Sequence, residues 1–156
     1  MSVKPAAVSV GIIPAPARGH VLFIERADGG IALPGGYVDE RENAAAAITR
    51  ESYEEMGLRL DAQKWRLFDS AATECNKLIL FSHYTDEVPA PAVFQANDEV
   101  LRVISAPWNT PLVFALHEQA LRRWAGMHGL PALALRPPRA VRVRADAANN
   151  PLSLSA

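Results

Sequence analysis

The sequence is poor in cysteine, since Cys75 is the only one among 156 residues. A single thiol excludes an intramolecular disulfide and leaves too few sulfur ligands for a cysteine-based zinc site. We therefore expect Cys75 to be a small packing residue and the fold to depend on its hydrophobic core. With 49% hydrophobic residues, the chain has enough apolar side chains to build that core.

Net charge is also nearly absent, because 16 Lys and Arg are balanced by 17 Asp and Glu, which leaves −1. Without an excess of positive charge, we expect no general affinity for nucleic acid or for anionic membranes. Residues 1–19 lack a signal-peptide pattern, and no run of about 18 apolar residues occurs. These absences predict a cytoplasmic protein without a membrane span.

Short runs rich in Val, Ile, Leu and Phe alternate with turn signals, which predicts a series of strands. The expected strands are residues 6–13, 20–25, 31–33, 64–73, 78–85 and 100–105. Gly35 and Gly36 follow Pro34 directly after the third strand, and this triplet predicts a loop that needs unusual backbone freedom.

Two segments have the composition of helices. From Asn43 to Met56 there is no Gly or Pro, Ala, Glu and Arg dominate, and Gly57 supplies a stop, which predicts a helix over residues 43–56. A second, amphipathic helix is expected over residues 112–125. Its predicted buried face consists of Leu112, Leu116, Ala120 and Leu121.

Strands interrupted by one central helix and followed by one late helix predict an α/β sandwich with a mixed sheet. We expect one domain over residues 1–130 and a Pro, Ala and Arg-rich tail over residues 131–156 that is largely disordered. The alternation in residues 140–144 leaves a second interpretation open, in which this segment is an edge strand, for example against a second subunit of a homodimer.

Three acidic residues share one face of the central helix. Glu51, Glu54 and Glu55 are spaced at i, i+3 and i+4, so their carboxylates lie within reach of one another. A solvated helix face is the ordinary explanation for such a cluster. Alternatively, the cluster binds a hard cation such as Mg²⁺ or Mn²⁺, which prefers oxygen ligands and relieves the repulsion between carboxylates.

The surrounding residues favour the metal-binding interpretation. The chain reads Gly36, five residues, Glu42, seven residues, and then the run RESYEEMGL from Arg50 to Leu58. This segment resembles the Nudix box, G-x5-E-x7-R-E-U-x-E-E-x-G-U, where U is a bulky aliphatic residue. Ser52 is the one departure, and it replaces an aliphatic residue that packs the helix against the sheet.

The resemblance to the Nudix hydrolase family implies a fold, an activity and a set of roles. The fold is an α/β/α sandwich, and the activity is metal-dependent hydrolysis of a phosphoanhydride bond in a nucleoside diphosphate derivative. The glutamates of the helix, together with a backbone carbonyl of Gly35 or Gly36, are expected to bind Mg²⁺, with Mn²⁺ as a possible substitute. Glu42 and Arg50 are expected to form a salt bridge that supports the box.

The sequence distinguishes poorly among substrates. A nucleoside triphosphate, cleaved to the monophosphate and pyrophosphate, is our first expectation, and ADP-ribose or a sugar nucleotide is the alternative. A non-catalytic nucleotide-binding domain is a further alternative, although such domains usually lack an intact box. Asn109 resembles an asparagine that reads the base in nucleoside-triphosphate-cleaving members, and Trp108 could stack on that base; an ordinary helix cap and a packing residue are the other interpretations.

Two carboxylates compete for the role of general base. Glu51 lies inside the box, whereas Glu99 lies in a polar segment just before the expected strand over residues 100–105. We expect Glu99 to be the base or a further metal ligand, because a carboxylate bound to cations is a poor proton acceptor. The four histidines lack metal-ligand spacing and are predicted to be structural or exposed; they are His20, His83, His117 and His128.

Overall fold

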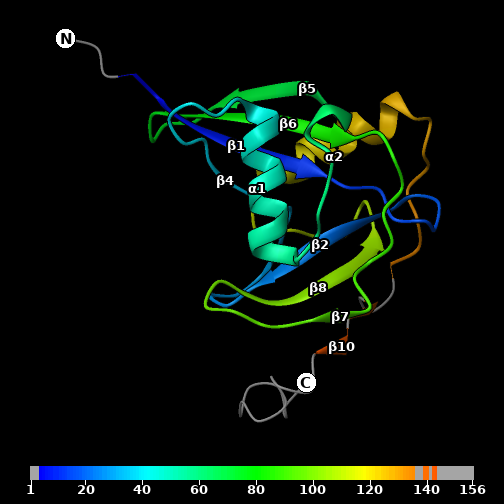
Figure 1. Cartoon of the computed structure of the whole chain (residues 1–156). Helices are drawn as coiled ribbons and strands as arrows, with labels where there is room; N and C mark the ends of the chain where they lie inside the picture. Colours follow the sequence, from blue (N-terminus) through cyan, green and yellow to red (C-terminus); the bar gives the residue numbers. More distant parts are fainter. Residues whose placement is uncertain (1–3, 136–138, 141, 144–156) are drawn as a thin grey trace.

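The computed structural model describes residues 4–135, 139–140 and 142–143. Figure 1 shows two sheets that enclose helix α1, with helix α2 on the far side. The elements are β1 (Ala6–Ile12), β2 (His20–Arg26), β3 (Ile31–Ala32), β4 (Gly35–Tyr37), α1 (Ala44–Met56), the short 3-10 helix η1 (Ala62–Lys64), β5 (Trp65–Ala72), β6 (Lys77–Tyr84), β7 (Val93–Phe94), β8 (Val100–Pro107), α2 (Ala115–Met127), β9 (Arg139–Ala140) and β10 (Arg142–Val143).

The strands form a mixed α/β architecture, as predicted. One sheet has the order β4-β1-β6-β5, in which β1 runs parallel to β6 and antiparallel to β4. A second sheet has the order β3-β2-β8-β9 and is antiparallel throughout. Parallel pairing of β1 with β6 requires a long crossover, and α1 lies in that crossover.

The core has two parts, one beneath each helix. Leu22 of β2 belongs to the cluster that contains Ile48 of α1, whereas its neighbour Phe23 belongs to the cluster that contains Leu121 of α2. Successive side chains of a strand point to opposite faces, so β2 is covered on both sides. This arrangement gives the layered sandwich that the sequence predicted.

Helix α1 begins and ends where its sequence predicts. Asn43 is the N-cap, and its side-chain oxygen accepts a hydrogen bond from the backbone N–H of Ala46 at 2.8 Å. Gly57 follows the last turn with a φ of 72°, a left-handed conformation that glycine adopts without strain. The position of the box glutamates on this helix is therefore fixed at both ends by local sequence.

Helix α2 starts later than predicted. The backbone N–H of Val113 donates to the carbonyl of Ile31, and that of Leu112 donates to the carboxylate of Glu118. The first bond holds the segment against β3 and the second holds it against the first turn of α2, so the segment is not helical and the helix begins at Ala115. Of the four expected face residues, two are buried and two are partly buried; the buried ones are Ala120 and Leu121, and the partly buried ones are Leu112 and Leu116.

The C-terminal segment contributes two short strands. β9 pairs with β8, and β10 pairs with β7, a strand that the sequence did not predict. The expected edge strand over residues 140–144 thus occurs in part, against strands of the same chain, while residues 141 and 144 of that segment lie outside the described residues. Of the tail over residues 131–156 that the sequence predicted to be largely disordered, residues 136–138, 141 and 144–156 lie outside the described residues.

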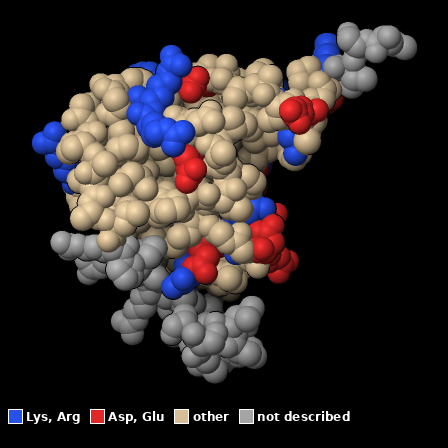
Figure 2. Space-filling view, turned by 180° about the vertical axis from the view of Figure 1, so that it is seen from behind, with Lys and Arg blue, Asp and Glu red and all other residues tan. Residues whose placement is uncertain are grey.

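The surface agrees with the balanced composition. On the face shown in Figure 2, charged side chains of both signs lie in small groups separated by uncharged surface. Cys75 is exposed in the turn between β5 and β6, so its expected packing role is wrong. Among the described residues, every helix is too short or too polar to cross a membrane.

Ser52 offers a test of packing within the box. Its side chain is fully buried, and its hydroxyl has no hydrogen-bond partner among the described residues. A buried polar group without a partner is destabilising, so we expect Ser52→Ala to raise the free energy of unfolding by about 1 kcal/mol. Urea denaturation followed by circular dichroism measures this change.

Ser9 supplies the matched control for that substitution. It is equally buried, but its hydroxyl donates to the carbonyl of Ala44 at 2.7 Å. Ser9→Ala should therefore lower the free energy of unfolding by about 1 kcal/mol, because it removes this buried hydrogen bond. Equal destabilisation by both substitutions would contradict the assignment of Ser52 as an unsatisfied group.

Candidate functional site

The three box glutamates lie on one face of α1 but differ in exposure. The side chain of Glu54 is 54% exposed and that of Glu51 is 13% exposed. Glu55 is buried, at 6%. The cluster is thus no solvated helix face, because two of its three carboxylates turn into the protein.

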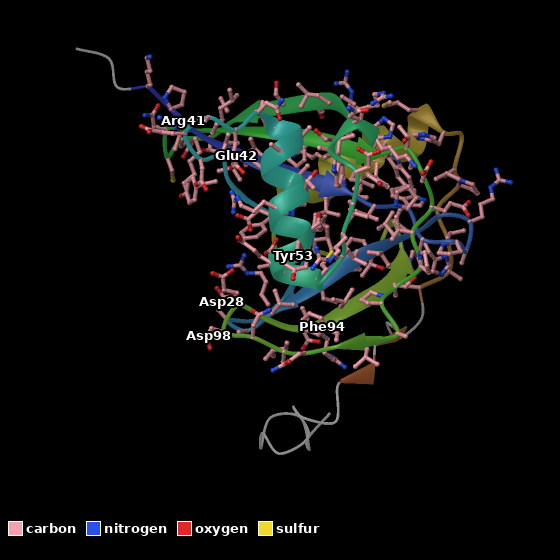
Figure 3. All side chains as sticks on the ribbon, viewed as in Figure 1. Asp28, Arg41, Glu42, Tyr53, Phe94 and Asp98 are labelled. Atoms are coloured by element: carbon pink, nitrogen blue, oxygen red, sulfur yellow. The ribbon has the colours of Figure 1, made fainter. Side chains whose placement is uncertain are left out.

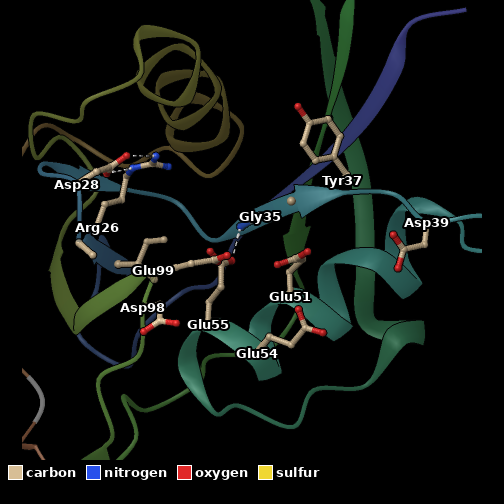
Figure 4. Close-up of a pocket in the computed structure, with 13 residues that line it drawn as sticks. Arg26, Asp28, Gly35, Tyr37, Asp39, Glu51, Glu54, Glu55, Asp98 and Glu99 are labelled. Carbon is tan, nitrogen blue, oxygen red and sulfur yellow. Dashed lines mark hydrogen bonds and ion pairs between the residues drawn. The ribbon is translucent and has the colours of Figure 1, made fainter.

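These carboxylates open into a cavity of about 510 Å³, which we call the acidic cavity (Figure 4). Its walls come from α1, from β4, from the end of β2 and from the loop before β8. Its lining residues are Ile24, Arg26, Ala27, Asp28, Gly35, Gly36, Tyr37, Asp39, Glu51, Glu54, Glu55, Asp98 and Glu99. Figure 3 shows that Asp28 and Asp98 approach this region from two different loops.

Glu55 is the most strongly perturbed carboxyl group in the cavity. Burial raises its pKa to about 8, although a hydrogen bond from the backbone N–H of Gly35, at 2.8 Å, acts in the opposite direction. The negative charges of Glu51 and Glu99 raise this pKa further. Such a group remains ionised at neutral pH only when a cation or another positive charge approaches it.

Arg50 connects the box to the adjacent strand. Its guanidinium makes two hydrogen bonds of 3.0 Å with the carboxylate of Glu42, as the resemblance implied, and a third of 3.0 Å with the carbonyl of Tyr37. The same group contacts Glu51 at 2.9 Å and Glu54 at 3.2 Å. The hydrogen bonds from Arg50 lower the pKa of Glu42, so this pair stays ionised.

Burial raises the pKa of Glu51, and the charges of Glu54 and Glu99 add to this effect, whereas Arg50 opposes it. The same kinds of effect, burial and neighbouring charges, raise the pKa of Glu55, but the two groups differ in one respect. Glu51 has a cationic partner, whereas among the described residues Glu55 is bonded only to a backbone amide. Arg50 therefore compensates part of the negative charge on the exposed side of the cavity, and Glu55 on the buried side makes no ion pair with any residue that the structure describes.

The predicted loop at Gly35 and Gly36 is in fact strand β4, paired with β1 through Ser9 and Val10. Neither glycine adopts a positive φ, so unusual backbone freedom is not their role. Instead they allow close approach: a Cβ on Gly36 would overlap the carboxylate of Glu51, and one on Gly35 would overlap the carbonyl of Ser9. The bare backbone of β4 thus forms one wall of the acidic cavity.

The loop before β8 brings a further acid, Glu99, into the cavity. Its backbone is fixed on both sides, since the carbonyl of Glu99 accepts from Ala27 and the side chain of Asn97 accepts from Glu99 and Val100. The carboxylate of Glu99 makes no ion pair within the part of the chain that the structure describes. Figure 4 shows it extended toward Glu55.

The donor set of the acidic cavity fits a hard divalent cation. Carboxylate oxygens of the three box glutamates and Glu99 share one cavity, and the raised pKa of Glu55 shows how costly their negative charge is without a counter-charge. Within the described ranges, no three acidic, histidine or cysteine side chains already converge into a closed metal site. Arg50 and Gly35 hold the oxygens of three glutamates instead.

A second cavity of about 560 Å³ adjoins the first and shares with it Ile24, Arg26, Gly35, Gly36, Tyr37 and Glu55. We call it the apolar cavity, because aliphatic and aromatic side chains form most of its walls. They include Val8, Val10, Leu33, Ile79, Phe114 and Leu116. The exposed Cys75 and the buried His117 also line this cavity.

Asn109 and Trp108 lie elsewhere. The side chain of Asn109 donates to the carbonyl of Leu133 at 2.9 Å and accepts from its N–H at 3.3 Å, and the indole N–H of Trp108 donates to Pro131. Neither residue lines the acidic or the apolar cavity. Both side chains bind the C-terminal segment, at Pro131 and Leu133.

The sequence reasoning missed several cavity residues, of which Arg26 is the most important. Its guanidinium is paired with Asp28 at 2.8 Å and lies 5.0 Å from the centre of the Phe114 ring. It lines both cavities and thus places a positive charge where they meet. The available signal was an arginine at the end of a strand whose central residues are all apolar. Tyr37 and Asp39 follow the glycine pair, and no sequence pattern marks them as cavity residues.

Comparison with known proteins agrees with the fold and the box. A family model of the NUDIX domain matches residues 5–139, past the domain boundary at 130 predicted from composition. A search of curated proteins gave no match. The chain is similar to several solved structures, all at low sequence identity.

A MutT/nudix family protein from Enterococcus faecalis is 16% identical, with a TM-score of 0.62 over 83% of this chain; the match spans 64% of the length of that protein. A putative nudix hydrolase family member from Chromobacterium violaceum is 22% identical, with a TM-score of 0.63, and 82% of this chain and 81% of that chain are covered. A MutT NUDIX hydrolase from Burkholderia pseudomallei is 21% identical, with a TM-score of 0.57 and coverage of 77% and 98%. At these identities, the likeness establishes the fold.

Proposed function

The chain belongs to the Nudix hydrolase family, whose members act on nucleoside diphosphate derivatives, and we propose that it hydrolyses a nucleoside triphosphate to the monophosphate and pyrophosphate with Mg²⁺. One observation carries this proposal. The acidic cavity, with its four glutamates, joins directly to an apolar cavity of similar size. A phosphate chain with its metal suits the first, and a nucleoside suits the second.

The apolar cavity has the chemistry that a nucleobase requires. Tyr37 and Phe114 line it, and both rings are unusually exposed for such large apolar groups, at 51% and 39%. Exposed aromatic rings in a concave site provide surfaces on which a planar base stacks. Val10 and Leu33 supply further apolar wall, so water is displaced when a base enters.

Arg26 is placed to bind the phosphate chain between the two cavities. It is the residue that brings positive charge to both of them, and its pairing with Asp28 fixes the orientation of the guanidinium. A phosphate attracts a guanidinium strongly through charge-assisted hydrogen bonds. We therefore assign Arg26 to holding the phosphates while the nucleoside occupies the apolar cavity.

Glu51, Glu54 and Glu55 would hold Mg²⁺, or Mn²⁺ in its place, with a backbone carbonyl of Gly35 or Gly36 as a further ligand. When bound, the cation neutralises the phosphates and lowers the pKa of the attacking water. Glu99 accepts a proton from that water. The water oxygen forms a bond to the α-phosphorus, the bond from this phosphorus to the bridging oxygen breaks, and pyrophosphate leaves.

A substrate screen with Mg²⁺ tests the proposal. Nucleoside triphosphates, ADP-ribose, sugar nucleotides and dinucleoside polyphosphates are compared at equal concentration, and products are separated by ion-exchange chromatography. We expect a triphosphate to give the monophosphate and pyrophosphate. Strong turnover of ADP-ribose or a sugar nucleotide with none of any triphosphate would overturn the substrate assignment, and binding without any turnover would indicate a non-catalytic domain.

A further inference from the structure

His117 is a buried polar residue of the apolar cavity that the hydrolytic mechanism does not use. It lies on α2, is 7% exposed, and lines the cavity beside Phe114, whose ring centre is 4.8 Å from that of the imidazole. The rings of Phe81 and Phe114 enclose it on two sides. A polar side chain in such surroundings requires hydrogen-bond partners.

One nitrogen of His117 has a partner, which determines the position of the proton. The backbone N–H of Leu33 donates to Nδ1 at 3.3 Å, so Nδ1 carries no hydrogen. Burial, and then the charge of Arg26, lower the pKa of His117 to about 4, so the ring is neutral at physiological pH. A neutral imidazole with a bare Nδ1 carries its hydrogen on Nε2 and is a donor there.

The Nε2–H of His117 has no acceptor among the described residues. In the part of the chain that the structure describes, two side-chain polar atoms are fully enclosed and lack a partner, namely Ser52 Oγ and Trp124 Nε1. Because Nε2 of His117 is not one of them, it is not fully enclosed by protein. The space that remains open to His117 is the apolar cavity that it lines. The cavity therefore contains a fixed hydrogen-bond donor, and a bound ligand can supply its acceptor.

We propose that His117 selects the nucleobase by donating its Nε2–H to a carbonyl oxygen on the base. This inference deepens the proposed function and rests on it. A fixed donor favours a base with a carbonyl at this position over a base with an amino group there, because two donors cannot bond to each other. The preferred substrates are then nucleotides of keto bases such as guanine or uracil, in preference to adenine or cytosine.

Paired substrates and paired variants test the assignment. His117→Phe keeps an aromatic ring but loses the donor, while His117→Gln keeps both an acceptor for Leu33 and a donor for the base. We expect the wild type to favour GTP over ATP, or UTP over CTP, by about tenfold in kcat/KM, mainly through KM. The phenylalanine variant should bring this ratio near one, and the glutamine variant should restore much of it.

A base-free substrate separates recognition from structural damage. Ribose 5-triphosphate has no base, so wild type and His117→Phe should cleave it at equal rates. An equal loss on this substrate and on GTP, or an unchanged GTP to ATP ratio in the variant, would overturn the inference.

Nuclear magnetic resonance distinguishes failure of this inference from failure of the proposed function. Addition of GMP or UMP to the wild type should shift the Nε2–H resonance of His117, whereas ribose 5-phosphate should not. A base-dependent shift without turnover of any triphosphate would refute the hydrolysis alone. Turnover of a triphosphate without such a shift would refute the role of His117 alone.

Discussion

Replacing Glu54 and Glu55 together by glutamine is expected to lower the rate of triphosphate hydrolysis by about 10³-fold or more. Glutamine preserves the shape of each side chain but removes two negative charges from the acidic cavity. A divalent cation stabilises the transition state by several kcal/mol, and each 1.4 kcal/mol or so corresponds to a tenfold change in rate. Steady-state release of pyrophosphate at saturating Mg²⁺ measures the loss.

The matched control removes the same number of charges elsewhere. Glu40 and Glu87 are exposed and do not line the acidic cavity, so glutamine at both positions should leave the rate nearly unchanged. Near-normal turnover in the Glu54 and Glu55 double variant would refute the assignment of the box glutamates to metal binding.

Stability provides a second measure of the same double substitution. The pKa of Glu55 is raised from 4.5 to about 8 in the folded protein, so metal-free wild type loses stability as pH rises from about 4.5 through about 8. The double variant lacks this ionisation, and its melting temperature should fall less over that range. Conversely, millimolar Mg²⁺ should raise the melting temperature of the wild type and leave that of the double variant unchanged.

The sequence predicted those parts of the fold that local chemistry determines. Asn43 caps α1 and Gly57 ends it because a side-chain oxygen and a left-handed glycine act on their own neighbouring turns. The positions of Glu51 and Glu55 on one face follow from helical periodicity alone. The element that carries the box could therefore be placed without knowledge of its surroundings.

Long-range contacts determined what the sequence could not predict. Gly35 and Gly36 have low strand propensity, yet they form β4 because β1 supplies the hydrogen-bonding edge. Asn109 resembled a base-reading residue in a turn, but its partner, Leu133, lies 24 positions away. No local pattern contains such information.

The burial of individual residues in the candidate site also could not be predicted from local sequence patterns. Spacing shows that Glu54 and Glu55 are adjacent on α1, but not that one is exposed and the other buried. The covering of Glu55 comes from β4, through the amide of Gly35, and its raised pKa follows from that burial. The role of His117 depends in the same way on a distant residue. Its Nδ1 accepts a hydrogen bond from the backbone N–H of Leu33, which lies 84 positions away.

Glu99→Gln is expected to lower turnover by about 10²–10⁴-fold, the usual contribution of a general base. Among the carboxylates of the acidic cavity, Glu51 is occupied by Arg50, and Glu55 is buried with a pKa of about 8 and bonded to Gly35. Glu99 has a fixed backbone and a carboxylate without an ion pair in the described residues, and that carboxylate extends toward Glu55, so we assign it the proton. Single-turnover kinetics at saturating Mg²⁺ and substrate measure the chemical step directly.

Asp98→Asn is the control for Glu99→Gln, because Asp98 lines the same cavity from the same loop and loses the same charge. We expect its effect on turnover to be much smaller. Neither substitution should change the melting temperature appreciably, since both side chains are exposed and the loop is held by Asn97 through backbone amides. If Glu99→Gln retained more than about a third of the wild-type rate, far short of the loss expected for a general base, Glu51 would become the base, and release of its carboxylate from Arg50 would have to precede the proton transfer.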